Sequence, residues 1–337
     1  MAQRRARQLF DLCAGFVYSQ ILHACVRLGL FRLLEGGPQT VEQVARELGL
    51  SVASARRLLD AARALQLLES ARDGRYRLSM LGAALRGNPG VARMIEHHSM
   101  LYRDLEDPVA LLRGRAATEL SRFWAYSSAE SPSQLEADRV ADYSTLMAES
   151  QHFIAGDVLD AYSFGRHRRL LDVGGGEGAF LLEAARREPR LTLGLFDLPA
   201  VAERAKARFA EAGLTNRVDC TGGDVFSDPL PLGADAISLV RIIHDHDDAE
   251  ALAIMRAVLT ALPTGGTIVV AEPMAATRGA VPIGDAYFGF YLLAMGRGRP
   301  RSAAELISML REVGFSRPKL VPTRRPMLTR VLVATKR

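Results

Sequence analysis

The spacing of apolar residues changes near residue 165 of this 337-residue chain. Before that point apolar residues recur every three or four positions, as from Leu9 to Leu34, and the run Gly36-Gly37-Pro38 ends this first pattern. Such a period is that of an amphipathic helix, and glycine with proline ends helices. After residue 165, short apolar runs alternate with helical segments. The pattern predicts a mainly helical N-terminal part followed by an α/β domain.

Residues 40–78 have the pattern of a winged helix. The expected elements are a helix from Val41 to Leu48 capped by Thr40, a second helix that Ser51 or Ser54 caps and that ends at Leu65, and a hairpin from Leu67 to Leu78 that turns at Asp73-Gly74. A winged helix suits either DNA binding or a dimerisation scaffold, so the charge of its second helix decides between them.

Arg56, Arg57 and Arg63 on that second helix leave contact with DNA phosphates open as an alternative. Acidic residues dilute this basic face, and they are Glu42, Glu47, Asp60 and Glu69. We therefore expect a dimerisation scaffold, a homodimer as the assembly and no nucleic-acid partner.

Seven strands are expected after residue 165. Five are separated by helices, at Leu170 to Val173, Leu191 to Phe196, Val218 to Thr221, Ala236 to Val240 and Thr267 to Ala271; the last two, Lys319 to Pro322 and Val331 to Thr335, have no room for a helix between them. Alternating strands and helices form a doubly wound parallel sheet, which an antiparallel hairpin here closes. The predicted fold is an α/β Rossmann-like domain with a mixed sheet at 166–337, after a dimerisation and winged-helix region at 1–88 and a helical substrate-binding region at 89–165.

The composition is that of an ordinary globular protein, with 48% hydrophobic and 24% charged residues. We expect no membrane span and no signal peptide, because no apolar run approaches about 20 residues, and the cytoplasm is the expected location. Cys13, Cys25 and Cys220 have no C-x-x-C spacing, so neither a disulfide framework nor a zinc site is indicated. The net charge of +5 leaves transient contact with an anionic membrane surface as a secondary possibility.

A glycine-rich turn follows the first predicted strand, where Leu170 to Gly178 reads LLDVGGGEG. Glycines permit positive φ and carry no Cβ, so a nucleoside cofactor can approach the backbone there. Gly174, Gly176 and Ala179 also fit a dinucleotide pattern. A carboxylate at Asp172, however, would repel a pyrophosphate and attract a cationic amino-acid group. Asp172 and the closing hairpin therefore favour S-adenosylmethionine over NAD.

Two more acidic residues follow predicted strands. Asp197 ends the second strand, where its carboxylate is placed to accept both ribose hydroxyls. Asp224 and Phe226 follow the third strand and suit an adenine, with the carboxylate on the exocyclic amine and the phenyl ring against the base. The cofactor-binding candidates are Asp172, Gly174, Gly175, Gly176, Asp197, Leu198, Asp224, Val225 and Phe226.

Candidate catalytic residues follow the fourth and fifth strands, at the rim where open α/β sheets bind ligands. His244 is the candidate base, because histidine titrates near neutral pH and can take a hydroxyl proton. Glu272 is placed to hold the imidazole in its useful tautomer and to stabilise its charged form. Asp245 can share either task.

Structural roles compete for the acidic residues around His244. Asp247 or Asp248, with Glu250, is typical of the start of a helix, here expected from Ala249 to Leu262. A metal site made of His244, Asp245, His246 and Asp247 is an alternative, but consecutive side chains point apart and few can converge on one ion. We therefore expect no metal.

The helical residues from about Val91 to Tyr162 carry many large apolar side chains. Most are expected in the core, and a minority are expected to line a substrate cavity facing the cofactor. Met147 and Trp124 are the first candidates for that lining, and the expected ligand is an apolar small molecule.

The motifs LDVGGGEG, FDLPAV, GGDVF, IIHDHDD and VVAEPM, behind a winged helix, resemble those of the S-adenosylmethionine-dependent O-methyltransferases of the caffeate and acetylserotonin type. The resemblance covers nearly the whole chain. The stretches ARMIEHHSMLYRDLEDPVALLRG and GDAYFGFYLLAMGRGRPRS resemble the branch that methylates hydroxylated acyclic carotenoids. This implies a tertiary hydroxyl as the acceptor. An enzyme for phenolic, indolic or polyketide acceptors would share every cofactor motif and is the alternative; a non-catalytic DNA-binding regulator is the less favoured one.

The same resemblance implies that Arg241 lies beside the amino-acid end of the cofactor and that His244 is the base. Plant relatives have a second glutamate within Gly-x-Glu-Arg-Thr, whereas residues 298–302 here read GRPRS. The carboxylate that partners His244 is therefore expected to be Glu272 or Asp245. A polyene is long, so we expect an apolar mouth near residues 297–301 and peripheral contact with the inner membrane. That mouth would be bordered by Tyr287, Phe288, Phe290 and Tyr291.

Overall fold

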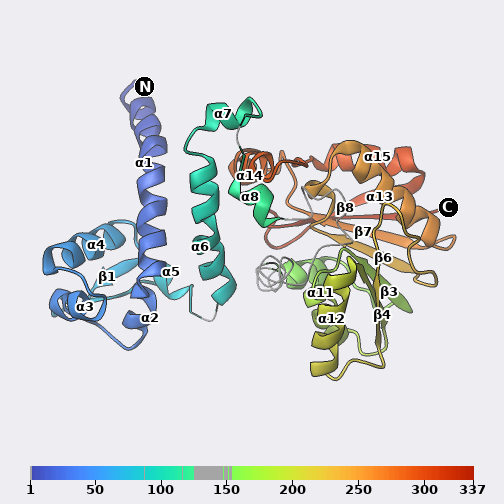
Figure 1. The fold of residues 1–337 in the computed structure, drawn as a ribbon, viewed down its shortest axis with the longest axis horizontal. Helices are drawn as coiled ribbons and strands as arrows, with labels where there is room; N and C mark the ends of the chain where they lie inside the picture. Colours follow the sequence, from blue (N-terminus) through green and yellow to red (C-terminus); the bar gives the residue numbers. More distant parts are fainter. Residues whose placement is uncertain (1, 87, 116, 125–146, 148–150, 152–153) are drawn as a thin grey trace. The chain divides into compact units, whose positions relative to one another are not determined.

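The computed structural model describes residues 2–86, 88–115, 117–124, 147, 151 and 154–337 (Figure 1). The chain forms two compact units, Met1–Ser99 and Met100–Arg337. Much of the predicted helical substrate-binding region, including residues 125–146, lies outside the described residues. The three-part division at residues 88 and 165 stays a prediction.

The first unit contains the predicted winged helix. Its elements are α1 (Ala2–Arg27), α2 (Leu30–Glu35), α3 (Val41–Glu47), α4 (Val52–Ala64), β1 (Leu68–Ser70), β2 (Tyr76–Leu78) and α5 (Met80–Ala83), and α6 (Pro89–Asp104) begins in it. Thr40 caps α3 in a reciprocal capping box with Gln43, and Ser51 rather than Ser54 caps α4. β1 and β2 pair antiparallel, as the hairpin prediction requires.

Helix α1 differs from the expectation about membrane spans. Among the described residues, one helical stretch, Arg5–Arg27, is long and apolar enough to cross a membrane by length and composition alone. Polar residues such as Asp11 and Gln20 interrupt it, which is why no continuous apolar run was found in the sequence. Its apolar side chains are largely exposed in the single chain, with Phe10 at 71% and Leu12 at 78%. A helix face of this kind is typical of an interaction surface.

The second unit contains a seven-stranded sheet with the order β5-β4-β3-β6-β7-β9-β8. The strands are β3 (Arg169–Val173), β4 (Thr192–Asp197), β5 (Val218–Gly222), β6 (Ala236–Val240), β7 (Thr267–Glu272), β8 (Phe315–Val321) and β9 (Arg330–Lys336). The first five are parallel, whereas β9 pairs antiparallel with both β7 and β8. The predicted mixed sheet with a closing antiparallel hairpin is confirmed.

Two hydrophobic cores cover the two faces of this sheet, because successive strand residues point to opposite sides. Leu170 packs with residues of α11 (Ala179–Arg187) and α12 (Pro199–Glu211). Its neighbour Leu171 packs with residues of α13 (Asp248–Ala261) and α15 (Ala303–Val313). Figure 1 shows the same layers, with α11 and α12 on one side of the sheet and α13 and α15 on the other. Buried faces on both sides explain why the parallel strands are apolar throughout.

Besides the helical residues 154–161, this unit contains several short helices. They are α7 (Pro108–Leu112), α8 (Glu119–Phe123), the 3₁₀ turn η2 (Ile243–Asp245), the π-helix η3 (Pro282–Tyr287) and α14 (Phe288–Met295). The turn η2 connects the end of β6 to α13, and η3 runs directly into α14. Turns of 3₁₀ and π type are frequent at functional sites.

Candidate active site

A cavity opens at the carboxyl ends of β3, β4, β5 and β6, where the strand order reverses between β3 and β6. It encloses ≈ 1110 Å³, including solvent at its mouth. Open α/β sheets bind ligands at this switch point. The predicted residues that line it are Gly174, Gly175, Gly176, Asp197, Leu198, Asp224, Val225, Phe226, Arg241, Asp245, Met147 and Trp124.

The glycine loop provides the floor of this cavity. Gly174 has φ +69°, and a Cβ there would lie 2.4 Å from a methyl carbon of Ile242. Gly176 has φ +57° with no atom within 4 Å of a Cβ position, so its backbone faces open space. The loop therefore presents bare backbone to a ligand, as a nucleoside cofactor requires.

Asp172 does not line the cavity, and a direct contact between its carboxylate and a cationic ligand stays a prediction. The residue is 1% exposed, and the Ser238 hydroxyl donates to its Oδ1 at 2.6 Å. Because side chains alternate along β3, that of Asp172 points to the same face of the sheet as that of Leu170. Burial, partly opposed by the Ser238 hydrogen bond, raises the pKa of Asp172 to about 7. Asp172 thus supports the glycine loop from beneath.

Replacement of Asp172 by asparagine should remove a pH dependence of stability. Between pH 3.8 and about 7 the unfolded chain releases the Asp172 proton while the folded chain retains it, so stability falls as pH rises. About 1.4 kcal/mol per pKa unit gives a loss of roughly 4 kcal/mol. Denaturant titrations of the cofactor-free protein at pH 4 to 8 measure it. Parallel curves for wild type and Asp172→Asn would contradict this account.

Asp197 and Asp224 follow β4 and β5 as expected. The Asp197 carboxylate accepts from the Gly176 amide and the Leu198 amide, both at 2.7 Å, which ties it to the glycine loop. Burial raises the pKa of Asp197 to about 6. Asp224 accepts from the Phe226 amide at 3.0 Å, and both line the cavity. These acids and the open glycine backbone fit a cofactor with a ribose and an adenine.

Arg241 lies at the end of β6 with a strained backbone. Its φ of +60° is in the left-handed region that few non-glycine residues adopt, while its amide donates to the Ala271 carbonyl at 2.8 Å. Such strain is concentrated at functional sites. Arg241 lines the cavity, in keeping with its predicted place beside the cofactor.

His244 and Glu272 form a buried pair, as predicted. His244 is 6% exposed, and its Nδ1 contacts Glu272 Oε2. Glu272 is 2% exposed, and its other oxygen accepts from the amides of Ile242 at 3.0 Å and Ile243 at 2.7 Å. The carboxylate thereby fixes both the ring and the backbone of the turn that carries it.

Asp245 lies on the other side of the ring, with its Oδ1 3.1 Å from His244 Nε2. Burial alone would lower the pKa of His244, but the charges of Asp245 and Glu272 outweigh it and raise that pKa above 6.5. Asp245 lines the cavity, whereas His244 and Glu272 do not. The protein thus brings all three catalytic candidates together, with Asp245 nearest to the ligand space.

The predicted substrate-binding residues divide into two groups. Trp124 and Met147 line the cavity. Tyr287, Phe288 and Tyr291 lie behind it: the Trp124 indole donates to the Tyr291 hydroxyl at 2.9 Å, and the Phe288 ring packs edge-on against His244 with centroids 6.1 Å apart. The η3–α14 segment therefore lies against residues of the cavity wall and of the base, and the place of these three aromatic residues at a substrate mouth stays a prediction.

Sequence reasoning did not assign several residues of the lining. His246 lines the cavity with its ring 5.4 Å from that of Phe226, and it was considered only as a metal ligand. Its position two residues after His244, in the same segment behind β6, is the sequence feature that could have indicated a place in the lining. In the described part of the chain no group of three or more His, Cys, Asp or Glu side chains is placed to hold a metal ion. The other unassigned residues include Gln151, Glu177 and Arg297.

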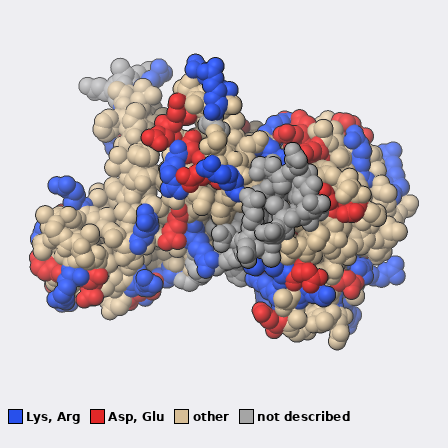
Figure 2. Space-filling view, viewed as in Figure 1, with Lys and Arg blue, Asp and Glu red and all other residues tan. Residues whose placement is uncertain are grey.

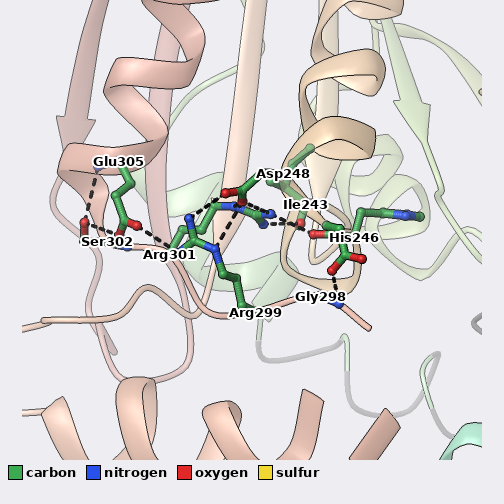
Figure 3. A network of polar contacts seen from close by, with 9 residues as sticks. Ile243, His246, Asp248, Gly298, Arg299, Arg301, Ser302 and Glu305 are labelled. Atoms are coloured by element: carbon green, nitrogen blue, oxygen red, sulfur yellow. Dashed lines mark hydrogen bonds and ion pairs between the residues drawn. The ribbon is translucent and has the colours of Figure 1, made fainter. Parts of the chain in front are cut away.

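The arginines of residues 297–301 are paired with acidic residues. Arg297 pairs with Glu250. Arg299 pairs with Asp248 and Glu305, and Arg301 pairs with Asp248 (Figure 3). Figure 2 likewise shows basic and acidic residues interspersed on the displayed face.

The capping role predicted for Asp247 is confirmed, since Asp247 and Glu250 form a capping box on α13.

Two families match the chain. Residues 102–316 match the O-methyltransferase domain, and residues 10–86 match the O-methyltransferase dimerisation domain, which supports a homodimer. On α4, Arg63 lies 3.2 Å from Asp60 and Arg56 lies 3.9 Å from Glu42, so both of these arginines have acidic neighbours.

Individual relatives agree with these families. Demethylspheroidene O-methyltransferase of Cereibacter sphaeroides is 45% identical over 336 residues, which cover 100% of this chain and 88% of that protein. The protein of the same name from Rhodobacter capsulatus is 40% identical over 334 residues, covering 99% and 83%. The crystal structure of human N-acetylserotonin methyltransferase in complex with SAM superposes with a TM-score of 0.82 at 25% identity, covering 98% of this chain and 97% of that one. This chain therefore belongs to the family of S-adenosylmethionine-dependent O-methyltransferases.

Proposed function

We propose that this enzyme methylates the tertiary hydroxyl of an acyclic hydroxycarotenoid of the demethylspheroidene type. The observation that carries the proposal is the identity of 45% and 40% to two demethylspheroidene O-methyltransferases along essentially the whole chain. Relatives named for 3-hydroxy-5-methyl-1-naphthoate and acetylserotonin are 31% identical. The difference favours the carotenoid over a phenolic or indolic acceptor.

The cavity supports an apolar acceptor next to the cofactor loop. Trp124 and Met147 contribute large apolar surface to the lining, and the indole is held by the Tyr291 hydroxyl. An apolar wall excludes water and strengthens the electrostatic interactions around His244. Such a site can hold one end of a polyene with its hydroxyl directed toward Asp245.

S-adenosylmethionine, when bound, supplies an electrophilic methyl group. We assign its nucleoside part to Asp197, Asp224 and Phe226 and its amino-acid end to Arg241. His244 Nε2 is the proposed acceptor of the hydroxyl proton, with Glu272 holding the Nδ1–H tautomer. Because Asp245 contacts Nε2, that carboxylate must yield its place to the hydroxyl or take part in the proton transfer.

A tertiary alcohol is far less acidic than a phenol, so His244 cannot remove its proton in advance. Proton removal must accompany methyl transfer. Positioning and desolvation of the hydroxyl then contribute most of the acceleration, for which effective molarities up to about 10⁸ M set the ceiling.

The proposal is tested with purified enzyme, labelled S-adenosylmethionine and a matched acceptor panel in detergent micelles. The panel comprises an acyclic carotenoid with a tertiary hydroxyl, its dehydrated analogue and a phenolic acid. We expect kcat/KM for the hydroxycarotenoid to exceed that for the phenol by about 100-fold, with no transfer to the dehydrated analogue. Preference for the phenol would refute the carotenoid assignment.

We further infer that the acceptor is taken from a membrane by transient, peripheral contact of a cytoplasmic enzyme. Phe290 on α14 is 37% exposed, which leaves apolar surface close to the cavity wall. Because the arginines at 297–301 are paired with acids, this contact should depend little on lipid charge. Equal co-sedimentation with neutral and anionic vesicles that contain hydroxycarotenoid is the expected result; no co-sedimentation with either would contradict it.

A further inference from the structure

We propose that Arg301 is a positioning residue for His244, because its buried guanidinium fixes the carbonyl groups of the short turn that carries the base. The inference rests on the role proposed for His244. Arg301 is 2% exposed although arginine is rarely buried. It does not line the cavity, so its effect on the reaction must pass through the turn.

The contacts of Arg301 converge on the two ends of that turn. Nη1 donates to the Ile243 carbonyl at 2.7 Å, and Nη2 donates to the His246 carbonyl at 2.7 Å. Asp248 orients the guanidinium by accepting from Nε at 2.9 Å and from Nη2 at 2.6 Å. Figure 3 shows the guanidinium between Asp248 and the turn. One side chain thereby holds the residues before and after His244 and Asp245.

The turn is held from the opposite side by Glu272, which accepts from the amides of Ile242 and Ile243. Glu272 therefore satisfies N–H groups of the turn, and Arg301 satisfies its C=O groups. A lysine cannot reproduce this, because only the planar guanidinium presents donors in several fixed directions. Loss of Arg301 would remove the donors at 2.7 Å from the carbonyls of Ile243 and His246, would leave the Ile243 carbonyl only the weaker bond from the His246 amide at 3.4 Å, and would free the turn to shift.

The neighbouring backbone leaves the turn little room for other positions. The Arg299 amide donates to the His244 carbonyl at 2.9 Å. Gly298 has φ +77°, and a Cβ there would lie 2.2 Å from the same carbonyl oxygen. The segment that ends at Arg301 is therefore in direct contact with the backbone of the base. A displacement of about 1 Å in such a group can cost 100-fold in rate.

The test compares Arg301→Met and Arg301→Lys with Arg299→Met. Arg299 is a matched control, because its guanidinium also pairs with Asp248 but makes no contact with a turn carbonyl. We expect Arg301→Met to lower kcat by roughly 10- to 100-fold, with S-adenosylmethionine affinity within about threefold of wild type. Arg301→Lys should recover part of the loss, and Arg299→Met should stay within about threefold. Thermal unfolding checks that each variant is folded.

A double-mutant cycle separates positioning of the base from a general structural role. If Arg301 acts through His244, Arg301→Met should cost under about threefold in kcat when introduced into His244→Ala. An equal loss in both backgrounds, or a folded Arg301→Met enzyme with wild-type kcat, would overturn the proposal. Failure of the base assignment is visible separately, as wild-type kcat in His244→Ala alone. If Arg301→Met does not fold, the cycle is run with Arg301→Lys.

Discussion

Replacement of His244 by alanine is expected to lower turnover by about 100-fold or more while leaving the affinity for S-adenosylmethionine unchanged within a few-fold. The variant keeps every residue assigned to the cofactor, namely Asp197, Asp224, Phe226 and Arg241, whereas the hydroxyl loses its proposed proton acceptor. Single-turnover methyl transfer and equilibrium binding of the cofactor measure the two effects separately.

His167 offers a matched control for that variant. It is also a histidine paired with a carboxylate, with an 8% exposed side chain 3.6 Å from Asp235, but it precedes the amino end of β3, whereas the cavity lies at the carboxyl ends of the strands. His167→Gln should retain wild-type turnover per folded molecule. Wild-type turnover in His244→Ala would remove the base assignment, and an equal loss in both variants would indicate a general loss of structure.

Replacement of Glu272 is expected to have the second largest effect. Glu272→Gln keeps the size of the side chain but removes the charge that raises the His244 pKa. Because the remaining oxygen is needed by the amides of Ile242 and Ile243, the new NH2 group would face His244 Nδ1 and disfavour the Nδ1–H tautomer. We expect kcat to fall roughly 100-fold and the pH at which activity rises to move downward. A pH–rate profile of kcat/KM measures both.

Glu272→Ala should in addition destabilise the fold. The amides of Ile242 and Ile243 would lose their acceptor inside the protein, at a cost of about 2–5 kcal/mol in the free energy of unfolding. Glu312→Gln is the control, because Glu312 pairs with Arg256 on the surface.

For the glutamine variant, an unmoved pH profile of kcat/KM in Glu272→Gln would contradict the proposed pairing of Glu272 with His244.

Local sequence signals predicted the strands, the glycine loop and the acids at the strand ends. These features follow from short-range rules: apolar runs give buried strands, and strands of one parallel sheet end at a common edge. The caps at Thr40 and Asp247 were predictable for the same reason, since a capping side chain bonds to amides two or three residues away.

The contacts of Asp172 and Tyr291 could not be predicted from nearby sequence, because they depend on distant segments. The carboxylate of Asp172 on β3 accepts a hydrogen bond from the hydroxyl of Ser238 on β6. Tyr291 meets Trp124, which is 167 residues away. The π-helix Pro282–Tyr287 also changes the phase of the helix that follows, which a 3.6-residue period does not anticipate.

Arg301 illustrates the same limit. In the sequence it is one of several arginines in a basic stretch, and its pairing with Asp248 crosses 53 residues. Only the fold shows that its guanidinium is buried against the carbonyls of the turn that carries His244. The sequence did not reveal that this basic stretch is neutralised, because the acids that pair with it come from α13 and α15.

The most direct measurement of the central claim is product analysis after a single turnover. Purified enzyme is mixed with methyl-deuterated S-adenosylmethionine and an acyclic carotenoid that carries a tertiary hydroxyl, and mass spectrometry locates the label. The account predicts one labelled methyl ether on the tertiary oxygen, formed by wild type and lost in proportion to activity in His244→Ala. Label on carbon, or no labelled carotenoid while a phenolic acceptor is methylated, would contradict it.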